Sequence, residues 1–454
     1  MTYNGKGNAQ YNLSSQYLKA GGEGEIYDII GQSGLVAKIY KPGKVNYEKE
    51  RKLIKMVSSP PDKSVLTQIA WPYDVLYNAG NFVGFVMPKM KINEDLNVIY
   101  EYGSTAKYRT MQWENRIIIA QNLCVVLNYI HDSGYVCGDL NPKNISVDPV
   151  TGFVVFLDTD SYHIVDLLNV YRCDVGMPEY LPVEIHKKMH GGKNLATAPL
   201  PTFSMDTDNF ALAVHVFQLL MNGVHPFACA VIPSQSSVPH PQPSDNIEKG
   251  EFPFMQNIPG IRIPVFAPKI SILPKDLQDL FKRAFIDGHT SPDLRPKPDE
   301  WHSALVGLTQ ELKTCKKFAH HQYYKSLSSC PWCEADKAFE KIMENTSTPA
   351  RSQINTSGVP PRPSVSAPVR TNWVGAFFGT LGKILLLIGF YLPQILGVLI
   401  SILGLYFMVT ANWDFGDFFM GAVFIAIGIA IYITKWKGLL IGGGLIGLFY
   451  MCTS

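Results

Sequence analysis

The sequence predicts an α+β fold in which strands come first and helices follow, succeeded by an all-α membrane-spanning region. Three observations lead to this prediction. Residues 16–40 alternate strand-like runs with glycines. Residues 116–131 are apolar on most sides of a helical pattern, which is typical of a buried helix. From Trp373 to Cys452 the chain is almost wholly apolar, which suits a bilayer better than a soluble core.

Composition excludes several classes of protein. Hydrophobic residues make up 46% of the 454 and charged residues 17%, and the apolar excess lies after residue 372. The formal net charge of +2 predicts no nucleic-acid partner. The eight cysteines are scattered apart from Cys330 and Cys333, which suits a reducing cytosol better than a disulfide framework. The polar N-terminus predicts no cleavable signal peptide.

A polar stretch from Asp139 to Asn144 offers side chains suited to phosphoryl transfer. Asp158 follows Asn144 by fourteen residues, at the end of the apolar run 153–157. Phosphoryl transfer needs a group that orients the proton of the nucleophile, and oxygen ligands for Mg²⁺. Asp139 suits the first task, and Asn144 and Asp158 suit the second. The sequence therefore predicts that these three side chains share one cleft.

A glycine-rich hairpin and a lysine precede this polar stretch. Gly21, Gly22 and Gly24 would let backbone amides approach a phosphate more closely than larger residues allow. Lys38 lies fourteen residues after Gly24 among apolar neighbours. A lysine in such surroundings is costly unless it is paired, so Lys38 is expected to have an anionic partner.

The order of these motifs resembles the eukaryotic-type (Hanks-type) protein kinase family. The family's catalytic loop, His-Arg-Asp-x-x-x-x-Asn, reads Cys-Gly-Asp-Leu-Asn-Pro-Lys-Asn at residues 137–144, and its Asp-Phe-Gly reads Asp-Thr-Asp at residues 158–160. The resemblance covers roughly residues 10–310. It implies a bilobal fold, with a small β-rich lobe at residues 1–88 and a larger helical lobe at residues 89–312.

The same resemblance implies that ATP and Mg²⁺ bind between the lobes. Lys38 would hold the phosphates and pair with Glu50 of the next predicted helix. Asp139 would orient the acceptor hydroxyl, and Asn144 and Asp158 would ligate Mg²⁺. The further residues expected to contact the nucleotide are Gly21, Gly22, Gly24, Ile26, Met87 at the hinge between the lobes, and Lys143.

Three more positions match structural features of the family. Residues 182–184 occupy the place of its Ala-Pro-Glu motif, and Arg295 would form a buried ion pair with Glu184. Asp208 would anchor the backbone of the catalytic loop. Residues 176–184 resemble the peptide-docking loop, which favours Ser/Thr hydroxyls of a protein substrate over a small-molecule substrate.

The sequence departs from the family at several positions. Gly138 replaces the arginine of the catalytic loop, so switching by loop phosphorylation is not expected. Asp160 replaces a glycine and adds a carboxylate, which could ligate Mg²⁺ or raise the metal requirement through like charge. Lys19 replaces the first glycine of the hairpin. The surviving features favour an active kinase; the alternatives are an inactive nucleotide-binding scaffold and a small-molecule kinase.

Residues 313–336 predict a zinc-binding module. The segment Cys330-Pro-Trp-Cys333 places two thiolates as a tetrahedral Zn²⁺ requires, and Cys315 with either His320 or His321 could complete the site. Similar bacterial kinase-like proteins carry a His-aromatic-Tyr run before Cys-Pro-Trp-Cys, which favours His321. The predicted ligands are Cys315, His321, Cys330 and Cys333.

The last part of the chain predicts a tether and a membrane anchor. Residues 337–372 are rich in Ser, Thr and Pro and are expected to form a linker. Residues 373–454 would span the bilayer three times, at about 384–410, 418–434 and 438–452. A fourth span would arise if the first of these were split at Tyr391–Pro393.

The positively charged residues that flank the predicted membrane spans favour three spans over four. Three spans put Lys435 and Lys437 on the same side as Arg370, as the positive-inside rule requires. Either topology leaves the kinase-like domain in the cytosol. The expected location is therefore the inner cell membrane of a bacterium, with the lipid bilayer as a partner and self-association as a further expectation.

Overall fold

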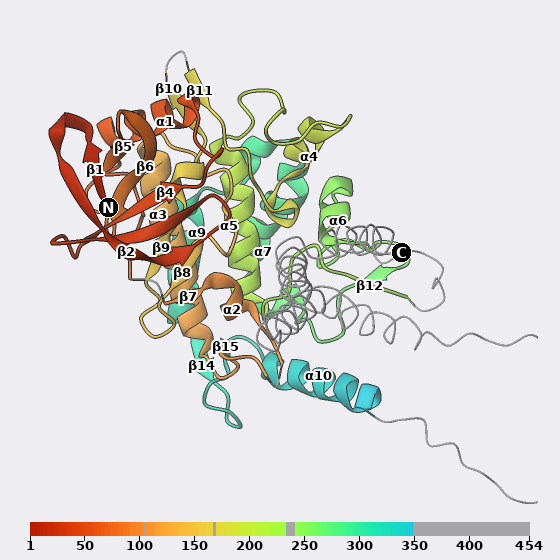
Figure 1. Ribbon diagram of the computed structural model, residues 1–454. Helices are drawn as coiled ribbons and strands as arrows, with labels where there is room; N and C mark the ends of the chain where they lie inside the picture. The colour runs from red at the N-terminus through yellow and green to blue at the C-terminus, as the bar shows by residue number, and fades with distance from the viewer. Residues whose placement is uncertain (92, 104, 167–168, 233–240, 348–454) are drawn as a thin grey trace, which may run out of the picture. The chain divides into compact units, whose positions relative to one another are not determined.

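The small N-terminal lobe is a β-barrel (Figure 1). The computed structural model describes residues 1–91, 93–103, 105–166, 169–232 and 241–347. The strands follow the spatial order β1-β2-β3-β4-β6-β5, and β1 pairs antiparallel with both β2 and β5, which closes the barrel. β1 has no counterpart among the predicted elements. The bounds are β1 Thr2–Gly5, β2 Gln10–Ala20, β3 Gly24–Ile29, β4 Leu35–Tyr40, β5 Asp74–Asn78 and β6 Asn81–Pro88.

Helix α1 (Tyr47–Ser58) packs against the barrel beside β5. The side chain of Asn46 accepts a hydrogen bond from the amide of Lys49 at 2.7 Å and so caps the first turn of α1. Leu53 and Met56 lie one turn apart on the inner face of α1 and are fully buried. This amphipathic face therefore fixes α1 on the barrel.

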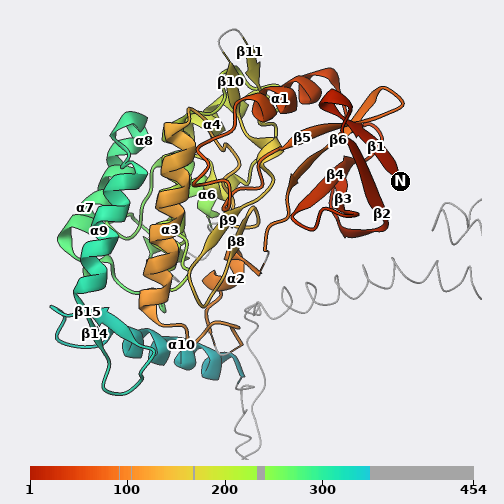
Figure 2. The ribbon, with the colours of Figure 1, turned by 90° about the vertical axis from the view of Figure 1, so that its left-hand side faces the viewer.

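The large lobe is built around α3 (Trp113–Asp132), with α9 (Pro298–Gln310) and α5 (Met205–Leu220) packed on it (Figure 2). α5 is buried along almost its whole length, because its sequence is apolar on most sides. The other helices are α2 Leu96–Tyr100, α4 Val183–Met189, α6 Pro243–Lys249, α7 Lys275–Lys282 and α8 Gly288–Thr290. The short strands are β7 Glu94–Asp95, β8 Ile145–Val147, β9 Val154–Phe156, β10 Ile164–Asp166, β11 Asn169–Tyr171, β12 Ala230–Val231 and β13 Ile261–Arg262.

The β8–β9 hairpin brings the two polar segments of the sequence together. β8 begins directly after Asn144, and β9 ends two residues before Asp158. The strands are antiparallel, so the start of β8 and the end of β9 lie side by side. The amide of Leu157 donates to the carbonyl of Asn144 at 2.8 Å and extends this pairing. The hairpin thus explains why segments distant in the sequence share one site.

The described chain ends in a small module below the large lobe. It consists of β14 (Leu312–Thr314), β15 (Gln322–Tyr324) and α10 (Pro331–Ser347). α10 runs well past residue 337, so the prediction of a linker from that residue is corrected: helix occupies its first part. The rest of that linker and the predicted spans of residues 373–454 lie outside the described residues. Within the described part of the chain, no helix combines the length and the apolar character that crossing a membrane requires.

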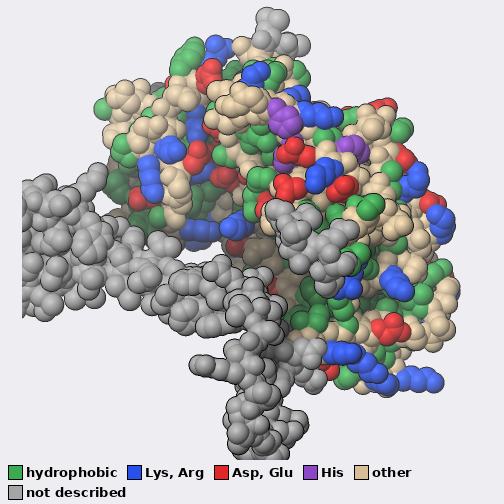
Figure 3. All heavy atoms as spheres, turned by 90° about the vertical axis from the view of Figure 1, so that its right-hand side faces the viewer, with side chains coloured by type: hydrophobic (Ala, Val, Ile, Leu, Met, Phe, Trp, Pro, Cys, Tyr) green, Lys and Arg blue, Asp and Glu red, His purple; other side chains and the backbone are tan. Residues whose placement is uncertain are grey.

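Charges are mixed on the molecular face drawn in Figure 3. On its described part, Lys and Arg side chains are interspersed with Asp and Glu, and histidine side chains also reach this face. Nucleic-acid-binding surfaces are typically continuous basic patches. This face offers no such patch among the residues that the structure describes.

Candidate active site and metal centre

The loop of residues 137–144, which matches the catalytic loop in the sequence, is anchored by the start of α5. Asp208 accepts hydrogen bonds from the amides of Cys137 at 2.7 Å and Gly138 at 2.9 Å. Gly138 has a φ of 78°, and a Cβ there would lie 3.1 Å from the side chain of Cys173. A left-handed, crowded position of this kind favours glycine. The packing of this loop therefore disfavours an arginine, or any larger side chain, at residue 138.

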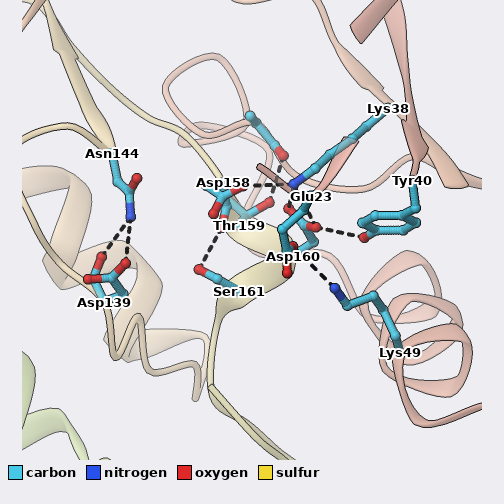
Figure 4. Close-up of polar contacts among 11 residues, drawn as sticks. Glu23, Lys38, Tyr40, Lys49, Asp139, Asn144, Asp158, Thr159, Asp160 and Ser161 are labelled. Carbon is cyan, nitrogen blue, oxygen red and sulfur yellow. Dashed lines mark hydrogen bonds and ion pairs between the residues drawn. The ribbon is translucent and has the colours of Figure 1, made fainter. Parts of the chain in front are cut away.

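Asp139 and Asn144 lie side by side at the end of this loop (Figure 4). The amide nitrogen of Asn144 donates to the carbonyl of Asp139 at 3.0 Å and to its carboxylate at 3.1 Å. Asn141 donates to the other carboxylate oxygen of Asp139 at 2.8 Å. Burial raises the pKa of Asp139, although the hydrogen bonds from Asn141 and Asn144 oppose this. The Asn144 amide oxygen points away from Asp139 and is available to a cation.

Asp158 lies at the bend after β9, with its backbone in the left-handed region at φ 53°. Its side chain is 40% exposed, and one carboxylate oxygen accepts from Lys38 Nζ at 2.7 Å. A 3-10 turn, Thr159–Ser161, follows immediately. Burial and the neighbouring carboxylate of Asp160 raise the pKa of Asp158, whereas Lys38 opposes this. Asp158 and Asn144 are thus the oxygen donors that fit a hard cation such as Mg²⁺.

Lys38 pairs with two aspartates, and the predicted pair with Glu50 is wrong. Lys38 Nζ lies 2.8 Å from each carboxylate oxygen of Asp160, in addition to its contact with Asp158. Glu50 instead accepts a hydrogen bond from the hydroxyl of Tyr77, on β5, at 2.9 Å. The pairing was missed because the partner comes from the segment after β9 and not from α1.

The ion pair shifts the titration of its members. Burial alone would raise the pKa of Asp160, but Lys38 and the Tyr40 hydroxyl lower it to about 2. Burial would lower the pKa of Lys38, but the two aspartates raise it above its usual range. Both groups are therefore charged in the folded protein at neutral pH.

The predicted nucleotide contacts border one cavity of about 300 Å³. The β2–β3 turn forms one wall, and the ends of the β8–β9 hairpin form another. A Cβ on Gly24 would lie 2.5 Å from the carbonyl of Ile39, so the backbones of β3 and β4 approach too closely for a larger residue. Of the predicted residues, the cavity is lined by Gly21, Gly22, Gly24, Ile26, Lys38, Met87, Lys143, Asn144 and Asp158.

Glu50 and Asp139 do not line this cavity. Asp139 accepts a hydrogen bond from Asn144, which does line it. Asp160 does line it. The sequence held one signal for the role of Asp160 as a partner of Lys38. Asp158 and Asp160 are two residues apart, and two neighbouring carboxylates need a nearby cation such as Lys38.

Glu184 and Arg295 form an ion pair within the large lobe. Arg295 Nη1 and Nη2 lie 2.6 and 2.9 Å from the two carboxylate oxygens of Glu184. Arg295 also donates to the carbonyls of Asp206 and Gly288, and it is only 2% exposed. The pair ties the segment after residue 182 to the helices of the large lobe.

The second cluster lies in the C-terminal module. Single ligand atoms of Cys315, His321, Cys330 and Cys333 all lie within 4.8 Å of one another. His321 Nδ1 is 3.7 Å from Cys330 Sγ and 3.6 Å from Cys333 Sγ, and Cys315 Sγ is 3.7 Å from Cys333 Sγ. A tetrahedral Zn²⁺ spaces sulfur and nitrogen ligands roughly 3.5–3.8 Å apart. The three thiols and the imidazole therefore fit zinc, and the cluster contains His321 and not His320.

The imidazole of His321 is oriented by a carboxylate that sequence reasoning missed. His321 Nε2 lies 3.3 Å from Asp336, which also accepts from the hydroxyl of Tyr102 at 2.8 Å. Such a contact presents Nδ1 to a metal. Asp336 lies three residues after Cys333 on α10, a spacing that faces the cluster.

The two lobes, together with a cavity that unites a glycine turn, a buried lysine and oxygen donors, fit a kinase-like fold. No family model matches the chain. The chain is similar to the protein named Protein kinase YegI, from Escherichia coli strain K12 and from E. coli O157:H7, with 29% identity over 336 residues in each case. The match covers 70% of this chain and 48% of each relative, so the chain spans about half the length of the curated relatives it matches.

Proposed function

We propose that this protein is an ATP-dependent protein kinase that transfers a phosphoryl group to Ser or Thr hydroxyls. One observation carries the proposal. Asp139 is held beside Asn144, and Asn144 lines the same cavity as Asp158, Lys38 and the glycine turn. The relatives named as protein kinases support the same class of reaction.

Each side chain has a separate task in this mechanism. Asp139 would accept the proton of the attacking hydroxyl, and its raised pKa makes it a better base than an exposed aspartate. Lys38 would bind the phosphates, and the backbone of Gly21–Gly24 would cover them. Asn144 and Asp158 would hold Mg²⁺, which when bound neutralises charge on the phosphates.

The substrate class rests on the segment before α4. Residues 176–184 include the 3-10 turn Pro178–Tyr180, and the Tyr180 hydroxyl donates to Gln218 of α5 at 2.9 Å. Together with the pair of Glu184 and Arg295, this contact holds the segment as a surface beside the catalytic loop. An extended peptide could dock on such a surface, whereas a small molecule would not need it.

Labelled ATP and Mg²⁺, incubated with the full-length protein and a mixture of peptides, test the proposal. Label on Ser or Thr that is lost in Asp139→Asn supports it. Tight ATP binding without transfer would indicate a scaffold, and label on a small molecule alone would indicate a small-molecule kinase. Either result would overturn the proposed function.

For the C-terminal cluster we propose one structural Zn²⁺, held by Cys315, His321, Cys330 and Cys333. Trp332, between two of these cysteines, packs against Trp113 at the start of α3 with ring centroids 5.2 Å apart. The metal would therefore also hold the module against the large lobe.

We further propose that residues 373–454 anchor the protein in the inner cell membrane with the kinase-like domain in the cytosol. The low charge of this segment supports the proposal. Fractionation of cells, followed by protease treatment of spheroplasts, tests it. Recovery of the full-length protein in the soluble fraction, or cleavage of the kinase-like domain from outside, would contradict it.

A further inference from the structure

We propose that Asp160 is the positioning residue for Lys38 and takes the place that a glutamate on α1 would otherwise have. The inference rests on the proposed kinase function, because Lys38 matters there as the phosphate-binding lysine. It assigns different tasks to two neighbouring carboxylates: Asp158 serves the cation, and Asp160 serves the lysine.

The contacts of Asp160 are those of a positioning group. Both of its carboxylate oxygens lie 2.8 Å from Lys38 Nζ, and one of them also accepts from the Tyr40 hydroxyl at 2.6 Å. Asp160 is 3% exposed and Lys38 is 7% exposed. A buried charge of this kind is tolerated only when it is paired and hydrogen-bonded, as both are here (Figure 4).

The same contacts argue against Asp160 as a metal ligand. Its oxygens are already engaged by Lys38 and Tyr40, and its side chain is 2% exposed. Asp158, two residues earlier, has a side chain that is 40% exposed. A divalent cation that enters with a nucleotide would therefore reach Asp158 and not Asp160.

The backbone around Asp160 is fixed independently of α1. The hydroxyl of Thr159 donates to the carbonyl of Ala70 at 2.6 Å, and the hydroxyl of Ser161 donates to the carbonyl of Asp158 at 2.7 Å. Lys38 is fixed in turn by β4, which pairs with β3 and β6. The ion pair thus joins the barrel directly to the metal-binding turn.

Glu50 offers a matched control, because it is the carboxylate that sequence order suggests and it bonds Tyr77 instead. Thermal unfolding of the nucleotide-free, full-length protein is measured for Lys38→Met, Asp160→Asn, Glu50→Gln and the two double variants that contain Lys38→Met. The fall in melting temperature of the double variant Lys38→Met/Asp160→Asn should differ from the sum of the falls in the two single variants by about 3 °C or more. The shifts for residues 38 and 50 should add to within about 1 °C.

Binding of a fluorescent ATP analogue separates lysine positioning from metal ligation. Asp160→Asn should weaken binding roughly 10-fold, and by the same factor with Mg²⁺ as with EDTA, because the effect passes through Lys38. Tyr40→Phe, which removes one hydrogen bond, should weaken binding by about 3-fold under both conditions. For Asp158→Asn the loss with Mg²⁺ should exceed the loss with EDTA.

Two results would overturn the inference: coupling of Lys38 to Glu50 and not to Asp160, or a loss in Asp160→Asn that appears only with Mg²⁺. The fate of the proposed function is read separately. If the wild-type protein binds nucleotide and transfers the phosphoryl group, but Lys38 is coupled to Glu50, the role of Asp160 is contradicted and the proposed function is not. If the wild-type protein neither binds nucleotide nor transfers a phosphoryl group, the proposed function is contradicted, whatever the unfolding data show.

Discussion

Arg295 donates hydrogen bonds to both carboxylate oxygens of Glu184, across 111 residues of sequence. Arg295 is nearly inaccessible to solvent, and Glu184 lies at the start of α4. The pair therefore ties the first turn of α4 to the last helices of the large lobe.

Removal of this arginine should destabilise the protein. Arg295→Met leaves the Glu184 carboxylate and two backbone carbonyls without their donor, and the expected loss is about 3–5 kcal/mol in the free energy of unfolding. Urea denaturation measures it. The control is Asp287→Asn, which breaks the surface pair with Lys282, and its cost should be under about 1 kcal/mol. Equal losses in both variants would contradict the structural role of the buried pair.

Asp139→Asn should abolish transfer without abolishing nucleotide binding. The substitution keeps the shape of the side chain but removes the proton acceptor, so kcat should fall by roughly 10²–10⁴-fold. Asp139 does not line the cavity, so the affinity for the ATP analogue should change by less than about 3-fold. A variant that loses binding and turnover in parallel would show that residue 139 acts on the nucleotide.

Metal content distinguishes the two adjacent histidines. His321→Ala should lose Zn²⁺, because His321 Nδ1 faces two thiols, whereas His320→Ala should keep one Zn²⁺ per chain. Asp336→Asn should weaken zinc binding by roughly 10–100-fold, because it leaves His321 less well oriented. Elemental analysis after dialysis, with chelator titration, measures these differences. Retention of zinc by His321→Ala would contradict the assigned ligand set.

Stability should fall as the pH drops from about 6.5 to about 4, because neutral histidines are buried in the large lobe. Burial lowers the pKa of His215 to about 4, although its contact with the Leu140 carbonyl opposes this; the pKa of His225 is lowered likewise to about 4. Between about pH 4 and about pH 6.5 each of these histidines binds a proton in the unfolded chain but not in the folded chain. Unfolding therefore becomes more favourable as the pH falls through this range. Each group contributes about 1.4 kcal/mol per pH unit in that window.

Urea denaturation between pH 7 and pH 4.5 measures this slope. His215→Gln removes one such group and should make the slope shallower by about one proton. His225→Gln removes the other such group and should make the slope shallower by the same amount. A slope that His215→Gln does not alter would contradict this assignment.

The sequence determined the local parts of this protein. The apolar pattern at residues 116–131 predicted the helix found at Trp113–Asp132, and the spacing of Asp139 and Asn144 placed two polar side chains on one loop, where they are hydrogen-bonded. Such features are set by neighbours along the chain, because a helical stripe or a loop between two strands repeats known geometry. The turn that places Cys330 and Cys333 as two metal ligands could be predicted for the same reason.

Only the tertiary structure decided which partners the charged groups have. Lys38 and Asp160 are 122 residues apart, and Glu50 seemed as suitable in the linear order. The contact of Asp336 with Tyr102 and the closure of the barrel by β1 depend in the same way on contacts between distant segments. The physical reason is that an ion pair or a metal site forms where folding brings atoms within about 3–4 Å, and separation along the chain does not measure that distance.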